Sequence, residues 1–153
     1  MTTKKLLLWF GLLFSPVATQ AQKLVIGSRV PDFKGVEWRT LPPRTETPTL
    51  IEFYAPGNAS SVRFFPKLAE ISRRFENIQI VVLTHGNASG TTADSLPAKY
   101  GDRYFIGVDP DGKVYRAFQV RYVPYTVLVN SKGELYWQGN LGNLSATVLE
   151  RVR

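Results

Sequence analysis

The feature that most constrains the fold is an apolar strand that runs, within a few residues, into a helix. Thr49–Tyr54 is apolar on both faces apart from Glu52, which is the pattern of a central strand covered on both sides. A helix is predicted over Asn58–Glu76, because Asn58 is a favoured N-cap and apolar residues then recur at three- and four-residue steps. Pro66 should kink this helix, since proline has no backbone N–H.

The rest of the chain predicts an α/β domain. A second buried strand, Ile78–Thr84, should lie parallel to the first because a helix connects them. Asn130–Gly133 reads as a hairpin turn in which glycine supplies the positive φ. Helices on both faces of a central mixed β-sheet are therefore expected. The further predicted elements are helices at Thr92–Tyr100, Lys113–Phe118 and Leu144–Arg153, and strands at Tyr104–Val108, Tyr125–Val129 and Glu134–Gln138.

The first 21 residues have the pattern of a secretory signal peptide. Lys4 and Lys5 form a positive n-region, an apolar run follows, and Thr19–Ala21 offers small residues before a cleavage site. The apolar run is shorter than the roughly 20 residues of a membrane span. We therefore predict cleavage after Ala21, a domain over residues 22–153, and a periplasmic or secreted protein without membrane attachment; a retained leader that acts as an anchor is the alternative.

Charge and residue types exclude several functions. The chain has a formal net charge of +7 and contains no cysteine. Its basic residues are scattered rather than clustered, so a nucleic-acid partner is not expected. With one histidine and no cysteine, no metal site is expected, and no motif calls for a cofactor. In an oxidising compartment, this domain would have to be stable without disulfides.

Several motifs, in order along the chain, carry a resemblance to a known family. They are the segments 26–33 (IGSRVPDF), 52–55 (EFYA), 108–120 (VDPDGKVYRAFQV), 123–126 (VPYT) and 130–134 (NSKGE), together with Pro66. In these features the chain resembles the TlpA-like branch of the thioredoxin superfamily, the exported redoxins of bacteria, over about residues 26–153. The resemblance implies a thioredoxin-like fold and thiol–disulfide exchange.

The chain departs from the family at the residues that carry its chemistry. Asn58 and Ser61 occupy the two positions of the Cys-x-x-C pair, and Gly57 replaces the preceding tryptophan. Disulfide exchange needs a thiolate and a second thiol, which an amide and a hydroxyl do not supply. Glu52 matches the buried acid below the cysteines, and burial should raise its pKa. We therefore expect no dithiol activity and no catalytic residue in this region.

Two structural roles are open for Asn58 and Ser61. Asn58 can cap the helix with Ser61 in its first turn, or the helix start can still attract anions or peptide carbonyls. The resemblance also implies a cis peptide between Val123 and Pro124, in a loop packed against that helix start. Val123, Pro124 and Tyr125 are accordingly the predicted peptide-binding residues, because pairing with an extended backbone needs no cysteine.

The predicted function is non-catalytic binding of an extended peptide or an exported partner protein, in a groove between Asn58 and the Val123–Pro124 loop. One alternative is an accessory role in a thiol–disulfide or antioxidant redoxin system in which a partner supplies the cysteines. A further alternative is a serine hydrolase that uses Ser61 and His85 with Glu52, although no nucleophile-elbow motif is present. The oligomeric state is left open.

Overall fold

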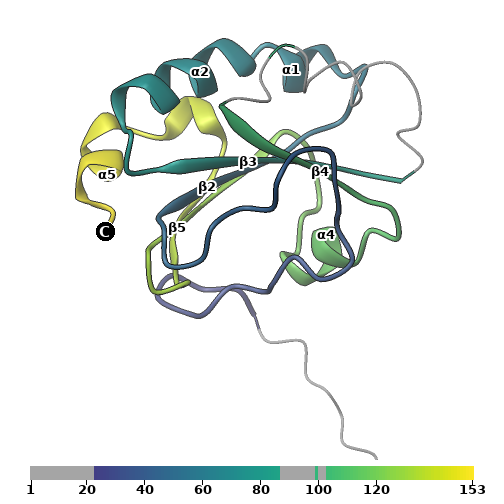
Figure 1. Ribbon diagram of the computed structural model, residues 1–153, viewed down its shortest axis with the longest axis horizontal. Coiled ribbons are helices and arrows are strands. Elements are labelled where there is room, and N and C mark those ends of the chain that lie inside the picture. Colours follow the sequence, from purple (N-terminus) through teal and green to yellow (C-terminus); the bar gives the residue numbers. More distant parts are fainter. Residues whose placement is uncertain (1–22, 87–98, 100–102) are drawn as a thin grey trace, which may run out of the picture.

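The computed structural model of the chain describes residues 23–86, 99 and 103–153 (Figure 1). The predicted signal peptide, residues 1–21, lies outside the described residues. The predicted helix at Thr92–Tyr100 also lies outside them, apart from Lys99. The domain boundary at residue 22 therefore stays a prediction.

The described part of the chain forms one six-stranded sheet with the strand order β1-β4-β3-β2-β5-β6. The three middle strands β4, β3 and β2 are parallel, and β1, β5 and β6 are antiparallel to their neighbours. The predicted mixed sheet is thus confirmed. The strands are β1 (Glu37–Trp38), β2 (Thr49–Phe53), β3 (Gln79–His85), β4 (Tyr104–Asp109), β5 (Tyr125–Val129) and β6 (Leu135–Gly139).

Strand β2 lies between β3 and β5, and all five of its residues are buried. Because side chains alternate along a strand, Leu50 and Glu52 face one side of the sheet, and Ile51 and Phe53 face the other. The two apolar clusters of the core follow this alternation, since Leu50 belongs to one cluster and Ile51 and Phe53 to the other. The near-continuous apolar run in the sequence reflects this burial on both faces.

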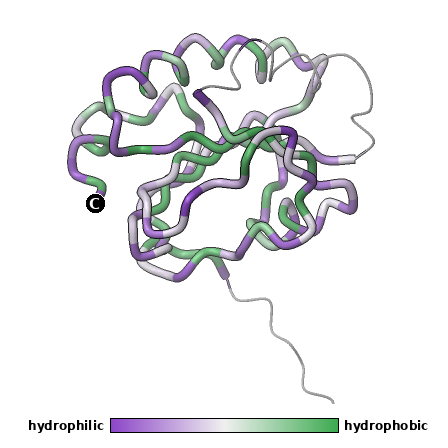
Figure 2. Tube along the Cα trace, viewed as in Figure 1, coloured by the Kyte–Doolittle hydropathy of each residue, from purple (hydrophilic) through white to green (hydrophobic). Residues whose placement is uncertain are grey.

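Helices cover both faces of the sheet, as predicted. Helices α2 (Phe65–Arg74) and α5 (Ala146–Arg151) pack on the Leu50 face, and α4 (Lys113–Ala117) packs on the Phe53 face (Figure 1). Figure 2 shows hydrophobic residues concentrated along the central strands and polar residues along the outer turns. Of the described helices, none is long and apolar enough to cross a membrane.

The single kinked helix predicted over Asn58–Glu76 is wrong, because the structure has two helices there. Helix α1 (Ala59–Val62) ends at Arg63, and α2 begins at Phe65 with Pro66 in its first turn. Pro66 cannot donate a backbone hydrogen bond, so it cannot continue α1. In the first turn of a helix the backbone N–H groups have no partner within the helix, so the donor that proline lacks is not needed there. This explains why a new helix begins at this point.

Smaller differences lie near the chain ends and in the loop before β2. The C-terminal helix is shorter than predicted, since it begins after Ser145, whose Oγ accepts the Val148 N–H. Strand β1 and the short 3-10 helix η1 (Leu141–Asn143) were not predicted. The segment at residues 40–48 is a loop, and the buried Gln79 amide bonds to the backbone of Arg44 within it.

Candidate functional site

Strand pairing brings two loops to the same end of the sheet. Phe53, the last residue of β2, pairs with Tyr125, the first residue of β5, and with Leu83 of β3. The segment that leads from β2 into α1 and the segment that leads into β5 therefore meet beside one another. This is the end of the sheet where the sequence placed its candidate site.

Asn58 is a helix cap. Its Oδ1 accepts the backbone N–H groups of Ser60 at 2.9 Å and Ser61 at 3.2 Å, and its own backbone is extended. These are donors that the start of a helix otherwise leaves without partners. The capping role predicted from the sequence is therefore confirmed.

Ser61 is buried and takes part in the same turn. Only 1% of its surface is exposed, and its Oγ accepts the backbone N–H of Ala55 at 3.2 Å. This hydrogen bond joins the first turn of α1 to the segment that leaves β2. The Ser61 hydroxyl therefore satisfies a backbone donor, and its burial shields it from a substrate.

Glu52 lies in the centre of the sheet, one residue before β2 ends. It is 1% exposed, and Thr126 Oγ1, on the paired position of β5, donates to its Oε2 at 2.5 Å. Its Oε1 has no hydrogen-bond partner among the described residues. Burial raises the pKa of Glu52 from 4.5 to about 8, and the Thr126 hydrogen bond opposes only part of that rise. The expected rise is confirmed, and Glu52 is an uncharged acid at neutral pH.

The predicted peptide-binding residues begin β5 and the loop before it. The Val123–Pro124 peptide bond is cis, and all three residues, including Tyr125, are partly exposed. Tyr125 donates its hydroxyl hydrogen to Gln138 Oε1 at 2.9 Å, and its ring meets that of Tyr122 edge-on at 5.5 Å. Desolvation and the neighbouring Tyr122 raise the pKa of Tyr125.

Tyr122 is the residue that sequence analysis did not select. Its side chain is 61% exposed, which makes it one of the few large apolar side chains on the surface of the described chain. Val62, in the last position of α1, is also exposed, at 41%. The sequence signal that could have identified Tyr122 is a large aromatic residue just before a proline turn. Aromatic residues are common anchors at binding surfaces.

His85 ends β3 on the opposite face of the sheet from α1 and α2. Its side chain lies on the same face of β3 as that of Leu83, which packs in the Phe53 cluster, and its ring meets that of Tyr115 edge-on at 4.6 Å. Ser61 lies in α1, which leads into α2 on the Leu50 face. No hydrogen bond joins Ser61 to His85. The serine-hydrolase arrangement drawn from the sequence is therefore wrong.

Tyr115, which sequence analysis also missed, packs against this end of the sheet on the Phe53 face. Its hydroxyl lies 3.0 Å from the carbonyl oxygen of Tyr54 and 2.7 Å from that of Leu83. Burial raises the pKa of Tyr115 above its usual range, so it stays a hydrogen-bond donor. Nothing in the sequence could show this role, since it depends on the packing of α4 (Lys113–Ala117).

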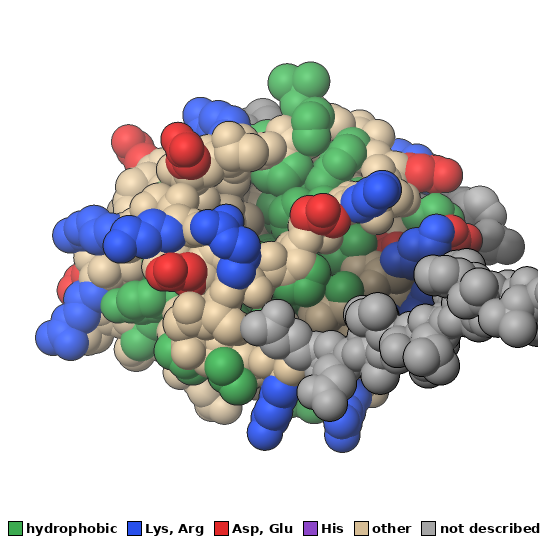
Figure 3. All heavy atoms as spheres, turned by 90° about the horizontal axis from the view of Figure 1, so that it is seen from below, with side chains coloured by type: hydrophobic (Ala, Val, Ile, Leu, Met, Phe, Trp, Pro, Cys, Tyr) green, Lys and Arg blue, Asp and Glu red, His purple; other side chains and the backbone are tan. Residues whose placement is uncertain are grey.

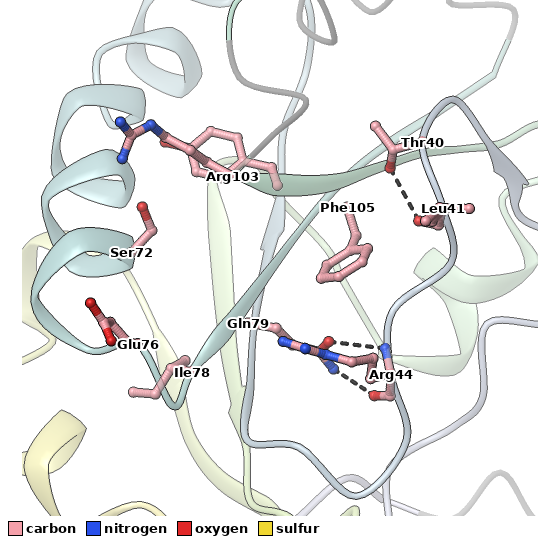
Figure 4. A pocket seen from close by; sticks show the side chains of 10 residues that line it. Thr40, Leu41, Arg44, Ser72, Glu76, Ile78, Gln79, Arg103 and Phe105 are labelled. Atoms are coloured by element: carbon pink, nitrogen blue, oxygen red, sulfur yellow. Dashed lines mark hydrogen bonds between the residues drawn. The ribbon is translucent and has the colours of Figure 1, made fainter.

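Two crevices are described, and both lie around the loop before β2. One, of about 590 Å³, lies between α2 and this loop, with Phe105 and Gln79 in its floor (Figure 4). The second, of about 1020 Å³, lies between this loop and the segments 29–33 and 131–134. Neither is lined by residues 58–61 or 122–125, so these crevices are not the predicted groove.

The side chains in the part of the chain that the structure describes do not form a metal centre. No group of three His, Asp or Glu side chains there could hold a metal ion. On the face drawn in Figure 3, Lys and Arg side chains are interspersed with Asp and Glu around a region of apolar side chains.

Solved structures identify the fold. A thioredoxin-like protein in its oxidized form has a TM-score of 0.68 with this chain, at 19% identity, covering 83% of this chain and 98% of its own. The chain has a thioredoxin-like fold. A protein assigned as thiol:disulfide interchange protein DsbE from Chlorobium tepidum gives a TM-score of 0.61 at 19% identity, over 76% of this chain and 85% of its own.

A secreted disulfide oxidoreductase from Mycobacterium tuberculosis shares the thioredoxin-like fold at a TM-score of 0.52 and 16% identity, over 69% of this chain and 78% of its own. No protein-family model matches the sequence, and no curated protein matches it either. At these identities the likeness concerns the fold. The absence of cysteine separates this chain from the chemistry that two of these names describe.

We predict that Ser61→Ala destabilises the fold by about 1–3 kcal/mol, because the buried Ala55 N–H loses its acceptor. Urea denaturation monitored by tryptophan fluorescence would measure the change. The matched control is Ser60→Ala, since Ser60 is exposed in the same helix turn and should change stability by less than about 0.5 kcal/mol. Equal effects of the two substitutions would show that the Ser61 hydroxyl has no structural role.

We also predict that burial of Glu52 makes stability depend on pH. The folded state keeps its proton up to about pH 8, whereas the unfolded chain releases it near 4.5. The free energy of unfolding should therefore fall between these values by about 1.4 kcal/mol per pH unit and be constant below pH 4.5. Glu52→Gln should remove this slope in urea titrations from pH 5 to 8, and the exposed-site control Glu70→Gln should keep it. An unchanged slope in Glu52→Gln would contradict the assignment.

Proposed function

We propose that this protein is an exported, non-catalytic binding protein of thioredoxin-like fold, which takes an extended peptide segment of a partner protein. The binding surface consists of residues 122–125 and the helix start at Asn58; we call it the Tyr122 surface. The observation that carries the proposal is the contrast at this end of the sheet: Asn58 and Ser61 are engaged in backbone hydrogen bonds, whereas Tyr122 is 61% exposed.

The proposed lack of thiol–disulfide exchange rests on the side chains at the site. A thiol–disulfide exchange requires a thiolate that attacks and a second thiol that resolves the mixed disulfide. Asn58 and Ser61 provide neither, and the neutral Glu52 has no thiol from which it could take a proton. What the site retains is its backbone arrangement and its exposed aromatic side chain.

Two features of the Tyr122 surface support peptide binding. A loop that enters a strand can pair with an extended backbone, as in other modes of recognition by strand addition. Tyr122 provides exposed apolar area just before the start of β5. Tyrosine combines a large apolar ring with a hydroxyl, and few side chains contribute as much to binding energy when they become buried.

The proposal of export rests on the first residues of the chain. The charged, apolar and small-residue regions occur in the order of a secretory signal, and Ala21 ends the small-residue region. The similar fold of a secreted oxidoreductase supports this location. A partner would accordingly be another exported protein.

Tyr122→Ala should weaken binding of extended peptides by about tenfold, because the exposed ring is the expected anchor. An array of 13-residue peptides that scan an unfolded, cysteine-free protein would measure binding of the mature chain. The matched control is Leu41→Ala, which removes a 79% exposed apolar side chain that lines the crevice beside α2. The proposal fails if no peptide binds, or if Leu41→Ala weakens binding as much as Tyr122→Ala does.

The exported protein should begin at Gln22, since cleavage after Ala21 removes the leader. Intact-mass measurement of the protein from the extracytoplasmic fraction would show the loss of residues 1–21. Ala21→Leu should block the cleavage, because the processing site requires a small residue. A full-length wild-type chain retained in the membrane fraction would instead show that the leader is an anchor.

A further inference from the structure

Strand β6 forms one edge of the sheet, and part of its outer edge has no backbone partner. Its inner edge pairs with β5. On the outer edge, the N–H and the carbonyl oxygen of Leu135 each bond to residues 27–28 at 2.8 Å, and the preceding chain then turns away through the Ser28–Val25 hydrogen bond. No other described residue makes a backbone hydrogen bond to the outer edge of Tyr136–Gly139. We call this stretch the free edge of β6.

The free edge lacks the features that usually protect an edge strand. Proteins commonly place a charged residue, a proline or an irregular pairing where an edge could otherwise join another strand. Tyr136–Gly139 contains neither a charged residue nor a proline. The pairing of β6 with β5 shifts register between Leu128 and Val129, next to the end that residues 27–28 cover, and is regular from Trp137 onward.

The opposite edge of the sheet, β1, is protected. It consists of two residues, and the exposed Glu37 lies 3.5 Å from the guanidinium of Arg39. Short edge strands and charged side chains both hinder pairing with another chain. Of the two edges of the described sheet, β6 alone therefore offers backbone groups to a further strand.

The side chains along the free edge are uncharged and rich in aromatic rings. Residues 135–149 contain no Asp, Glu, Lys or Arg, although 20% of the whole chain is charged. Tyr136 and Trp137 are partly exposed, and both pack on the Leu50 face of the sheet. Depletion of charge and enrichment of Tyr and Trp distinguish the centre of a protein–protein interface from the rest of the surface.

We propose that the free edge of β6 pairs antiparallel with the same edge of a second copy of this chain, so that two sheets join across a two-fold axis. A strand edge is complementary to itself in this arrangement, because each outward N–H of one copy faces an outward carbonyl of the other. The axis keeps the Leu50 faces of both copies on one side, which brings the Tyr136 and Trp137 side chains of both together. This inference does not depend on the proposed peptide binding.

Charge favours a second copy over a charged segment of another protein. The free edge itself provides no cation for an acidic segment and no carboxylate for a basic one. Two copies of a chain with a formal net charge of +7 repel one another, so an uncharged strip is where they approach at least cost. The pairing also closes, because it uses the free edge of both copies and leaves only the protected edges.

A free edge of this length predicts a small interface and therefore a weak dimer, with a dissociation constant of about micromolar order. Sedimentation velocity of the mature protein, at concentrations from about 1 to 200 μM, spans that range. The mass should rise from that of one copy to that of two and then stay constant.

Tyr136→Lys should weaken this dimer by at least about tenfold, because it places like charges close together across the axis. The matched control is Thr147→Lys, which adds the same charge at an exposed position on α5, within the same uncharged segment, and should leave the dimer unchanged. A second measurement does not need the Tyr136 variant to fold. Because the chain has no cysteine, Gln138→Cys gives a single thiol on β6, and a short bismaleimide should join two copies through it but not through Thr147→Cys.

A wild-type protein that stays monomeric up to the highest concentration would overturn the proposal, and so would a mass that rises beyond two copies. Equal dissociation of the dimer in Tyr136→Lys and Thr147→Lys would place the contact elsewhere on the surface. Equal crosslinking of the two cysteine variants would contradict pairing at β6 in the same way. The proposed peptide binding stands or falls separately, in the peptide array described above.

Discussion

The structure depends on strand β2 being buried on both faces and paired on both edges. Its neighbours β3 and β5 use the backbone groups of its two edges, and its five side chains are all enclosed. A chain that leaves such a strand and begins a helix six residues later must satisfy several backbone donors locally. Asn58 and Ser61 do so through their side chains, which is why polar residues remain at these two positions although neither can carry out redox chemistry.

The same enclosure explains the behaviour of Glu52. A carboxylate at this position would be charged in a region with little water, which is unfavourable unless it is paired. The structure supplies one hydrogen bond, from Thr126, and no cation among the described neighbours, so the side chain keeps its proton. The carboxyl oxygen Oε1 still lowers stability, because it is buried without a hydrogen-bond partner among the described residues. Glu52 is thus a residue that the packing of this sheet tolerates rather than one that stabilises it.

The sequence predicted those elements that depend on local pattern. It did not predict features that are determined by residues distant in the sequence but close in space. Strand β5 was predicted at its observed bounds, and β2 and β3 within one residue, because apolar runs and the hairpin turn mark them. Pro66 was recognised, but its effect was underestimated, because a kink and a new helix start cannot be distinguished from one proline. The roles of Thr126 and Tyr115 depend on strand register and helix packing, which no local pattern contains.

Catalysis and binding differ in how much they depend on single atoms. Disulfide exchange requires two sulfur atoms at fixed positions, so replacement of two residues abolishes it. Binding of an extended segment depends on backbone geometry and on side chains spread over two loops. In this chain the strand register that joins Phe53 to Tyr125 holds those loops together without any contribution from a thiol. The backbone arrangement on which the proposed binding depends is therefore independent of the atoms that disulfide exchange requires.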